Sequence, residues 1–274
     1  MKEVKINKKF EKILEDIKSI KIQGAENVAK AGMKAYLLEP TKSSAKKIIS
    51  TRSTEPLLQN FIKVLLKSKN PKKTYKNLLK ELKKSHEIIV KQGAKLIKNN
   101  MNVYSHCHSS TVIDILIYAK KKQKKDFVVY TSEVEPLLQG RQTAKDLAKA
   151  KIKTIVSPDL AAEQSLKNCD IFLFGADAFN KKVVANKIGT STLCKLSKHY
   201  NIPTYSCAVS MKFTNLLKME LRASYEVWKD NNKFIDIFNP AFDKTPYSDL
   251  TGIISEFGVL SPKEFVKKAK QNLK

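Results

Sequence analysis

The feature that most constrains the fold is the alternation of short apolar runs with helix-like segments between residues 103 and 207. Each run has the length and composition of a buried strand and is followed by an amphipathic segment of helical length. Because this alternation is typical of parallel strands joined by right-handed crossovers, it predicts an α/β fold with a mostly parallel sheet and flanking helices. The expected strands are 103–105, 127–131, 152–156, 171–174 and 203–207, and the expected helices are 111–119, 139–150, 160–167 and 190–199.

The run 171–174 is the clearest of these strands, because four consecutive apolar residues indicate a strand that is covered on both faces. Gly175 ends the run and Asp177 follows closely. A short loop is then expected to lead to Asn186 and Lys187, just before the next helix. Ligands of open α/β sheets bind beyond the carboxyl ends of the strands, so this stretch is where we expect chemistry.

The chain divides near Asn100 into a helical N-terminal domain, residues 1–99, and an α/β domain, residues 100–274. In the first part apolar residues recur at steps of three and four, which is typical of amphipathic helices. The expected N-terminal helices are 10–20, 28–38, 57–66 and 75–96, with a break at 50–56 and a turn at 70–71. After the sheet, 234–238 and 252–255 are expected to be strands and 262–273 a closing helix.

The formal net charge of +26 suggests an attraction to phosphorylated ligands. Arginine, the residue that best recognises phosphates and bases through its planar fork, occurs only at Arg52, Arg141 and Arg222. Lysines supply the remaining positive charge and are spread along the whole chain. This distribution favours solvated faces over a specific nucleic-acid site, so RNA or DNA is not the expected partner.

The cysteines and the apolar segments argue against a metal site and a membrane anchor. Cys107, Cys169, Cys194 and Cys207 show no zinc-ligand spacing, and free thiols are expected. No segment approaches the roughly 18 apolar residues that identify a membrane span. The start of the chain, residues 1–10, lacks the apolar core of a signal peptide, so a cytoplasmic location is expected.

Cys107 lies in the sequence Ser-His-Cys-His-Ser-Ser at residues 105–110, where a strand is expected to give way to a helix. A helix N-terminus carries partial positive charge, which lowers the pKa of a nearby thiol. Ser109 can cap the helix or, with its free amides, bind a phosphate. The alternative is an inert buried thiol next to an ordinary serine cap.

Other polar residues also follow expected strands. Gln139 precedes a helix, and Lys212 follows the strand 203–207, although each residue could also belong to an ordinary turn or an exposed surface. Parallel strands place all their carboxyl ends on one edge of the sheet, which would bring Gln139, Lys187 and Lys212 close to Cys107 and Asp177. A thiol, a carboxyl group and several cations on one edge form the composition of an active site.

Several short motifs, in matching order, resemble a known superfamily. They are His106-Cys-His-Ser109, Gln139-Gly140, Gly175-Ala-Asp177, Asn186-Lys-Ile-Gly-Thr190, Met211-Lys-Phe213 and Asn239-Pro-Ala-Phe-Asp-Lys-Thr-Pro246. The resemblance is to the regulatory subunits of initiation factor 2B, the methylthioribose-1-phosphate isomerases and the archaeal ribose-1,5-bisphosphate isomerases. It implies a helical N-terminal domain, a Rossmann-like C-terminal domain, and homodimers or larger homo-oligomers.

The resemblance also implies roles for individual residues. Cys107 and Asp177 match the catalytic cysteine and aspartate of the isomerases. The positions that match substrate-binding residues are Gln23, Gly24, Ala25, Arg52, Ser109, Gln139, Asn186, Lys187 and Lys212. Two positions depart from the pattern. Gln23 replaces an arginine, and Glu135 stands where an arginine is usual and could repel a phosphate.

The resulting hypothesis is an aldose–ketose isomerase acting on a ribose phosphorylated at its anomeric carbon, preferably ribose 1,5-bisphosphate, without a metal or other cofactor. Asp177, kept protonated by burial, would be the acid that opens the ring, and Cys107, as a thiolate, would be the base or charge stabiliser. The alternative is a non-catalytic regulatory subunit that senses a sugar phosphate or nucleotide and binds a translation initiation factor. Gln23 and Glu135 favour this alternative, whereas Cys107 favours the enzyme. An RNA-binding protein is the third possibility.

Overall fold

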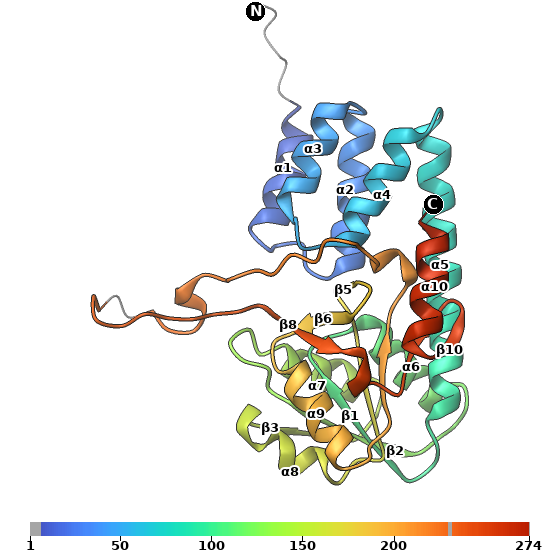
Figure 1. Cartoon of the computed structure of the whole chain (residues 1–274), viewed down its shortest axis with the longest axis vertical. Coiled ribbons are helices and arrows are strands. Elements are labelled where there is room, and N and C mark those ends of the chain that lie inside the picture. Colours follow the sequence, from blue (N-terminus) through green and yellow to red (C-terminus); the bar gives the residue numbers. More distant parts are fainter. Residues whose placement is uncertain (1–6, 230–231, 274) are drawn as a thin grey trace, which may run out of the picture.

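The protein consists of a group of N-terminal helices stacked against an α/β sandwich (Figure 1). The computed structural model describes residues 7–229 and 232–273. The N-terminal helices are α1 (Lys8–Lys18), α2 (Ala25–Leu38), α3 (Lys42–Thr51), α4 (Pro56–Lys67) and α5 (Pro71–Leu96). Helix α5 runs along one side of the molecule and packs against both the helical group and α6 of the sandwich (Figure 1).

A seven-stranded sheet forms the centre of the sandwich, with the strand order β10-β9-β7-β4-β1-β2-β3. Neighbouring strands are parallel except β9 and β10, which are antiparallel. The strands are β1 (Met101–His106), β2 (Phe127–Ser132), β3 (Thr154–Ser157), β4 (Ile171–Phe174), β7 (Thr204–Cys207), β9 (Gly252–Ser255) and β10 (Gly258–Leu260). The predicted α/β fold with a mostly parallel sheet and flanking helices is therefore confirmed.

Side chains alternate between the two faces of the sheet, as the pleat of a strand requires. Val103 and Leu173 belong to the core that includes α5, α6 (Ser110–Lys121) and α7 (Gln139–Lys149). Tyr104 and Phe174 belong to the core that includes α8 (Ala162–Leu166), α9 (Thr190–His199) and α10 (Pro262–Asn272). Strand β4 is buried along its whole length, which explains its continuous apolar run.

A second, smaller sheet was not predicted. The strands β5 (Ala178–Phe179), β6 (Val183–Lys187) and β8 (Phe242–Pro246) pair in antiparallel fashion beside the C-terminal edge of the main sheet. The expected loop before Asn186 and Lys187 is therefore wrong, because both residues lie on β6. Strand β5 is only two residues long, and β8 comes much later in the chain, so neither gives a local sequence signal.

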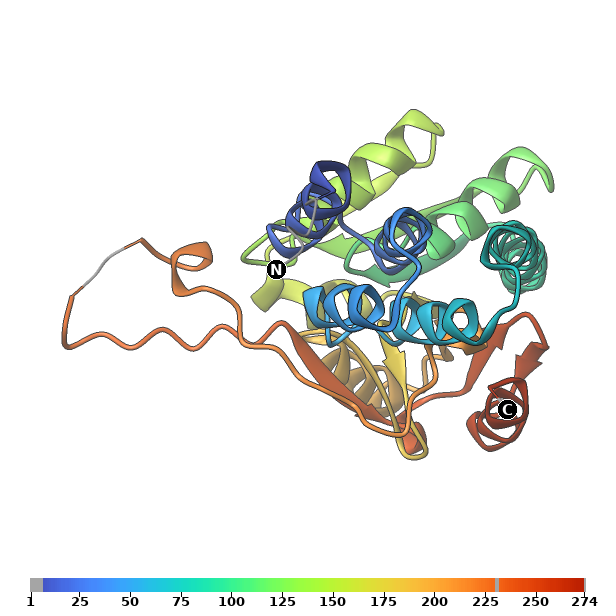
Figure 2. The same ribbon diagram turned by 90° about the horizontal axis from the view of Figure 1, so that it is seen from above.

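The predicted strand 234–238 is also wrong. This segment makes no strand pairing, and the side chains of Phe234 and Phe238 are 85% and 77% exposed. It belongs to a long arm, described over residues 214–229 and 232–240, which extends away from the body of the molecule (Figures 1 and 2). The alternating apolar pattern resembles a strand, but no neighbouring strand lies beside it to accept its backbone hydrogen bonds.

Two helix boundaries differ from the predicted ones. Asn70 and Pro71 begin helix α5 rather than forming an isolated turn, because the Asn70 side chain accepts a hydrogen bond from the backbone N–H of Lys73. Helix α3 was not among the expected helices; capped by Thr41, it continues to Thr51, so the break before α4 is shorter than expected. The division at residue 99 stays a prediction, and one hydrophobic core contains residues from both sides of it.

Within the described residues, the helices include none that is long and apolar enough to cross a lipid bilayer. The predicted lack of a signal peptide falls mainly on residues 1–6, which lie outside the described residues.

Candidate active site

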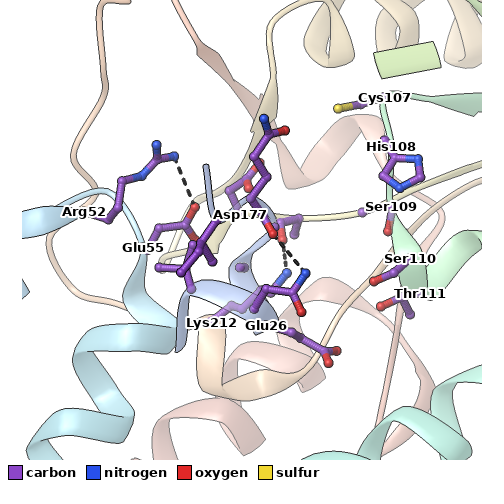
Figure 3. A pocket seen from close by; sticks show the side chains of 18 of the residues that line it. Glu26, Arg52, Glu55, Cys107, His108, Ser109, Ser110, Thr111, Asp177 and Lys212 are labelled. Carbon is purple, nitrogen blue, oxygen red and sulfur yellow. Dashed lines mark hydrogen bonds and ion pairs between the residues drawn. The ribbon is translucent and has the colours of Figure 1, made fainter. Parts of the chain in front are cut away.

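A cavity of about 1050 Å³ lies between the N-terminal helices and the carboxyl ends of the central strands. All the residues predicted for the site line this cavity: Gln23, Gly24, Ala25, Arg52, Cys107, Ser109, Gln139, Asp177, Asn186, Lys187 and Lys212. Figure 3 shows Arg52, Glu55, Asp177 and Lys212 on one side of the cavity and Cys107 with residues 108–111 on the other. The parallel topology thus gathers residues that are far apart in the sequence.

Cys107 follows β1 in a left-handed backbone conformation, with φ of 67°. Its carbonyl oxygen accepts a hydrogen bond of 2.9 Å from the Thr143 hydroxyl of α7, which holds this turn against the neighbouring helix. The thiol donates to Oε1 of Gln139 at 3.4 Å. Gln139 therefore positions the sulfur, and both residues face the cavity from adjacent strand ends.

Burial opposes the expected thiolate at Cys107. Burial of the sulfur, and next the negative charge of Asp177, raise the pKa of the Cys107 thiol to about 12, although Lys187 opposes this shift. A helix N-terminus would lower the pKa of the thiol, but Ser109 is the N-cap of α6, with its Oγ 3.4 Å from the backbone nitrogen of Val112. Cys107 precedes this cap, and burial favours its neutral thiol form.

Asp177 lies in the loop between β4 and β5, where its backbone N–H donates to the carbonyl of Ala185 at 2.9 Å. Burial raises the pKa of the Asp177 carboxyl, and the charges of Lys212, Arg52 and Lys187 oppose that shift. A raised pKa is what a buried general acid needs, because the carboxyl group then keeps its proton to a higher pH.

Asn186 and Lys187 are both buried at the end of β6. The Asn186 side chain donates to the Thr190 hydroxyl at 3.0 Å, and that hydroxyl donates to the Lys187 carbonyl at 2.6 Å. The backbone N–H groups of Gly189 and Ser191 donate to Asp243 of β8 at 2.9 Å each. Asp243 already accepts from these donors at the start of α9. The groups that remain to bind an anion here are therefore the side chains of Asn186 and Lys187.

Lys212 lies after β7, and its ammonium group donates to the carbonyl of Ala176 at 2.5 Å. Its backbone is held by Asn60 of α4, whose side-chain amide donates to the carbonyls of Met211 and Phe213 at 2.7 and 3.0 Å. The N-terminal helices therefore fix the position of Lys212 beside Asp177.

The N-terminal helices contribute Gln23, Gly24 and Ala25 at the start of α2. Gly24 is the N-cap with φ of 82°, and no side chain caps its helix. The backbone N–H groups of this first turn are available to an anion, as expected for a phosphate subsite. Glu135, by contrast, is exposed and does not line the cavity, so its charge lies apart from the site.

Glu55 and Glu220 are charged cavity residues that were not predicted. Arg52 lies 3.6 Å from Oε1 of Glu55 and 3.9 Å from Oε2 of Glu220, which belongs to the arm. Glu55 is 3% exposed, and its only sequence signal was its position beside Arg52 and before Pro56. Glu220 had no signal, because only the tertiary structure brings the base of the arm to α3.

A second charged group lies on the cavity wall where α2, α5 and α6 meet. His86 Nε2 is 2.8 Å from Oδ2 of Asp114, and its Nδ1 is 3.6 Å from Oε1 of Glu26. The hydrogen bond to Asp114 and the nearby carboxylate of Glu26 raise the pKa of His86 to about 9 against the effect of burial. Burial would raise the pKa of Glu26, but His86 and Lys30 outweigh it and lower that pKa to about 2.

Solved structures with the same fold are known. The chain is similar to the Pyrococcus horikoshii translation initiation factor eIF-2B, with a TM-score of 0.86, 25% identity, and coverage of 95% of this chain and 100% of the other. It also shares its fold with a 5-methylthioribose 1-phosphate isomerase from Pyrococcus horikoshii, with a TM-score of 0.77, 22% identity, and coverage of 96% and 88%.

Similar sequences include two archaeal proteins named ribose 1,5-bisphosphate isomerase. The Methanocaldococcus jannaschii protein is 32% identical, with 90% of each chain covered. The Thermococcus kodakarensis protein is 30% identical, with 91% of this chain and 90% of the other covered. A model of the Initiation factor 2 subunit family matches residues 14–262, and with these similarities it shows that the chain belongs to that family.

Proposed function

We propose that the protein is an aldose–ketose isomerase that converts ribose 1,5-bisphosphate to ribulose 1,5-bisphosphate. The observation that carries this proposal is the single cavity in which Cys107 and Asp177 face the same space as Lys187, Lys212 and the free amides of α2. The similar proteins from Methanocaldococcus jannaschii and Thermococcus kodakarensis carry the name of this activity.

The first chemical demand is opening of the ribose ring. A phosphate on the anomeric oxygen prevents spontaneous ring opening, so an acid must donate a proton to the ring oxygen. Asp177 is suited to this step because burial favours its protonated form. Lys212, held beside it through Ala176, stabilises the carboxylate that remains after the proton has left.

The second demand is a group that accepts a proton during transfer of hydrogen between C2 and C1. Cys107 starts as a neutral thiol, and the negative charge of Asp177 is one cause of its high pKa. Before Asp177 gives up its proton, that repulsion is absent, and Lys187 favours the thiolate. The acid and the base therefore titrate as a coupled pair in which a neutral Asp177 makes an ionised Cys107 less costly.

Phosphate binding is the third demand. Asn186, Lys187, Lys212 and the first turn of α2 supply amide and ammonium donors along the cavity. Hydrogen bonds from charged donors to phosphate oxygens are among the stronger ones in proteins, and such contacts orient the sugar between Asp177 and Cys107. Ser109 and Gln139 complete the wall around the sulfur.

A turnover assay with the purified protein tests the proposal, with ribulose 1,5-bisphosphate detected by a coupled carboxylation reaction. Activity on ribose 1,5-bisphosphate and a large loss in C107S and D177N are expected. A wild-type protein inactive on both this substrate and methylthioribose 1-phosphate would contradict the proposal. In heavy water, an enediol intermediate would exchange hydrogen with the solvent, whereas direct hydride transfer would not.

A non-catalytic regulatory subunit is the second candidate, and it is favoured by the charge around Arg52. Gln23 supplies no positive charge, and Glu55 and Glu220 already neutralise the guanidinium of Arg52. Such a protein would bind a sugar phosphate or nucleotide without turnover and bind a translation initiation factor. Capture of initiation factor 2 by a protein that shows no turnover would support this candidate.

We also propose that the protein forms a homo-oligomer through the arm. Leu221, Trp228, Phe234 and Phe238 expose between 52% and 85% of their surface on a segment that extends from the body of the molecule. Monomeric proteins rarely expose so many large apolar side chains together. A second copy of the chain is the proposed occupant of this surface.

A further inference from the structure

Glu55 is a buried carboxyl group in the cavity for which the proposed mechanism has no use. It is 3% exposed and precedes α4 at the N-cap position, where its side chain makes no capping hydrogen bond. Its Oε1 lies 3.6 Å from the guanidinium of Arg52 (Figure 3). Its Oε2 is buried and has no hydrogen-bond partner among the described residues. An unpaired buried carboxylate oxygen is costly, so this group requires an explanation.

Four charged groups from different elements surround Glu55. Asp177 comes from the loop after β4, Lys212 from the segment after β7, Arg52 from the end of α3, and Glu220 from the arm. Two further carboxyl groups therefore lie near Glu55, while Glu220 also pairs with Arg222 at 3.1 Å and Lys187 acts on Asp177. Carboxyl groups arranged in this way do not all ionise together, and one of them retains a proton more readily than it would in water.

The carboxylates beside Arg52 oppose the binding of an anion to its guanidinium. Its guanidinium faces Glu55 and Glu220, at 3.6 and 3.9 Å, and its Nε is buried without a hydrogen-bond partner among the described residues. A phosphate group that approached Arg52 would meet two carboxylates of its own sign. Anion binding is favourable here only if at least one of them is neutral.

We propose that Glu55 controls whether an anion can bind beside Arg52 at this end of the cavity, because Glu55 takes up a proton when the anion binds. In its neutral form, Glu55 releases the guanidinium and offers an O–H donor to the anion. In its ionised form, it holds Arg52 and repels the anion. The proton comes from solvent, and no bond to carbon changes. The inference deepens the proposed function because it assigns a condition for phosphate binding at the same site.

The protonation behaviour of Glu55 agrees with this geometry. Burial, and next the charge of Asp177, raise the pKa of Glu55 to about 7, while Lys212 and Arg52 oppose the shift. Protonation is therefore easily reached near neutral pH. Well above the pKa, the neutral fraction falls about tenfold per pH unit, and the affinity for an anion at Arg52 should fall with it.

Sulfate is a suitable probe because it stays a dianion across the whole range of the experiment. Its binding to the full protein is measured by isothermal titration calorimetry between about pH 6 and about pH 8.5, a range that brackets the relevant ionisation. Two buffers with different ionisation enthalpies give the number of protons taken up. The expected result for the wild type is falling affinity and increasing proton uptake as the pH rises through the upper part of this range.

The decisive variant is E55Q, which is expected to bind sulfate with little dependence on pH and without the proton uptake. In D177N the pH dependence should persist but move to lower pH, because the charge of Asp177 no longer raises the pKa of Glu55. R52A should lose the binding, which locates the sulfate. E87Q removes an exposed carboxylate of α5 outside the cavity and should match the wild type. If E55Q does not fold, as judged by circular dichroism, E55A takes its place.

Two outcomes would overturn the inference: a wild-type protein that does not bind sulfate near pH 6, or an E55Q variant that keeps the wild-type pH dependence and proton uptake. These measurements need no turnover. A protein that shows the expected sulfate behaviour but does not isomerise ribose 1,5-bisphosphate would therefore contradict the proposed function and leave the role of Glu55 standing.

Discussion

At the scale of single residues, the protonation states of the cavity residues depend on the charges of their buried neighbours. Asp177 raises the pKa of both Cys107 and Glu55, and its own pKa is raised by burial. The positive charges of Lys187 and Lys212 limit these shifts. Removing one charge should therefore change the protonation of its neighbours as well as its own contacts.

C107S and D177N should each lower turnover of ribose 1,5-bisphosphate by roughly 10² to 10⁴-fold, which is the range for loss of a general acid or base. Both are close in size to the wild-type residue, so the fold should persist. The measurement is the initial rate in the coupled assay. C169S is the matched control, because Cys169 is buried in the core behind the sheet and does not line the cavity. Retention of full activity by C107S would refute the assignment.

At the scale of elements, two junctions determine the shape of the cavity. The first joins β2 to α7, where Gly140 packs directly against the end of the strand. The second joins α5 to α2 and α6 through the charged group of His86, Glu26 and Asp114. Each junction makes a different measurable contribution to stability.

G140A should destabilise the protein, because an added Cβ would lie 1.7 Å from the backbone carbonyl oxygen of Ser132. The clash is with backbone, so α7 must shift, and Gln139 beside Cys107 must move with it. We expect a loss of about 1 to 3 kcal/mol or more, as for other overpacking changes, together with reduced turnover. Chemical denaturation measures the first effect. K145A on the exposed face of α7 should change stability by less than about 0.5 kcal/mol.

His86 should make stability depend on pH in the alkaline range. Its pKa in the folded protein, about 9, is above the ordinary value of 6.5, so its stabilising contribution is complete below 6.5 and is lost as the pH rises through about 9. As the pH rises from 6.5 to about 9, the stability of H86N should therefore fall less than that of the wild type. Thermal unfolding at several pH values measures the difference. If the unfolding temperatures of the two proteins change with pH in the same way, the contact of His86 with Asp114 and Glu26 does not stabilise the fold.

At the scale of the whole molecule, the arm and the net charge govern association. The base of the arm supplies Glu220 and Arg222 to the cavity, and its outer part carries the exposed apolar side chains. An interface that covers the outer part would also hold the base of the arm in place. Assembly and the geometry around Arg52 are therefore connected through one segment.

Replacing Trp228, Phe234 and Phe238 together with serine should shift the protein from an oligomer to a monomer, because the apolar area that drives association is removed. The side chains are exposed in the single chain, so its stability should change little. Sedimentation velocity or light scattering measures the mass. A matched triple serine variant at the exposed lysines Lys80, Lys83 and Lys84 should remain oligomeric. A wild-type monomer at all concentrations would contradict the role of the arm.

The sequence determined the regular parts of the fold because their signals are local. The apolar run at 171–174, the helical periodicity before residue 99 and the polar residues after each strand were sufficient to predict the α/β sheet and a common edge for Cys107 and Asp177. The family resemblance added Gln23 and Arg52, and both line the same cavity.

Only the tertiary structure decided the features that depend on distant partners. The strand β6 under Asn186 needs β8, and the apolar segment 234–238 is not a strand because it has no neighbour. The charge state of Cys107 and the role of Glu55 depend on burial and on Asp177, and neither can be read from adjacent residues. Pairing, burial and electrostatics act between groups close in space, whereas sequence patterns report what happens within one element.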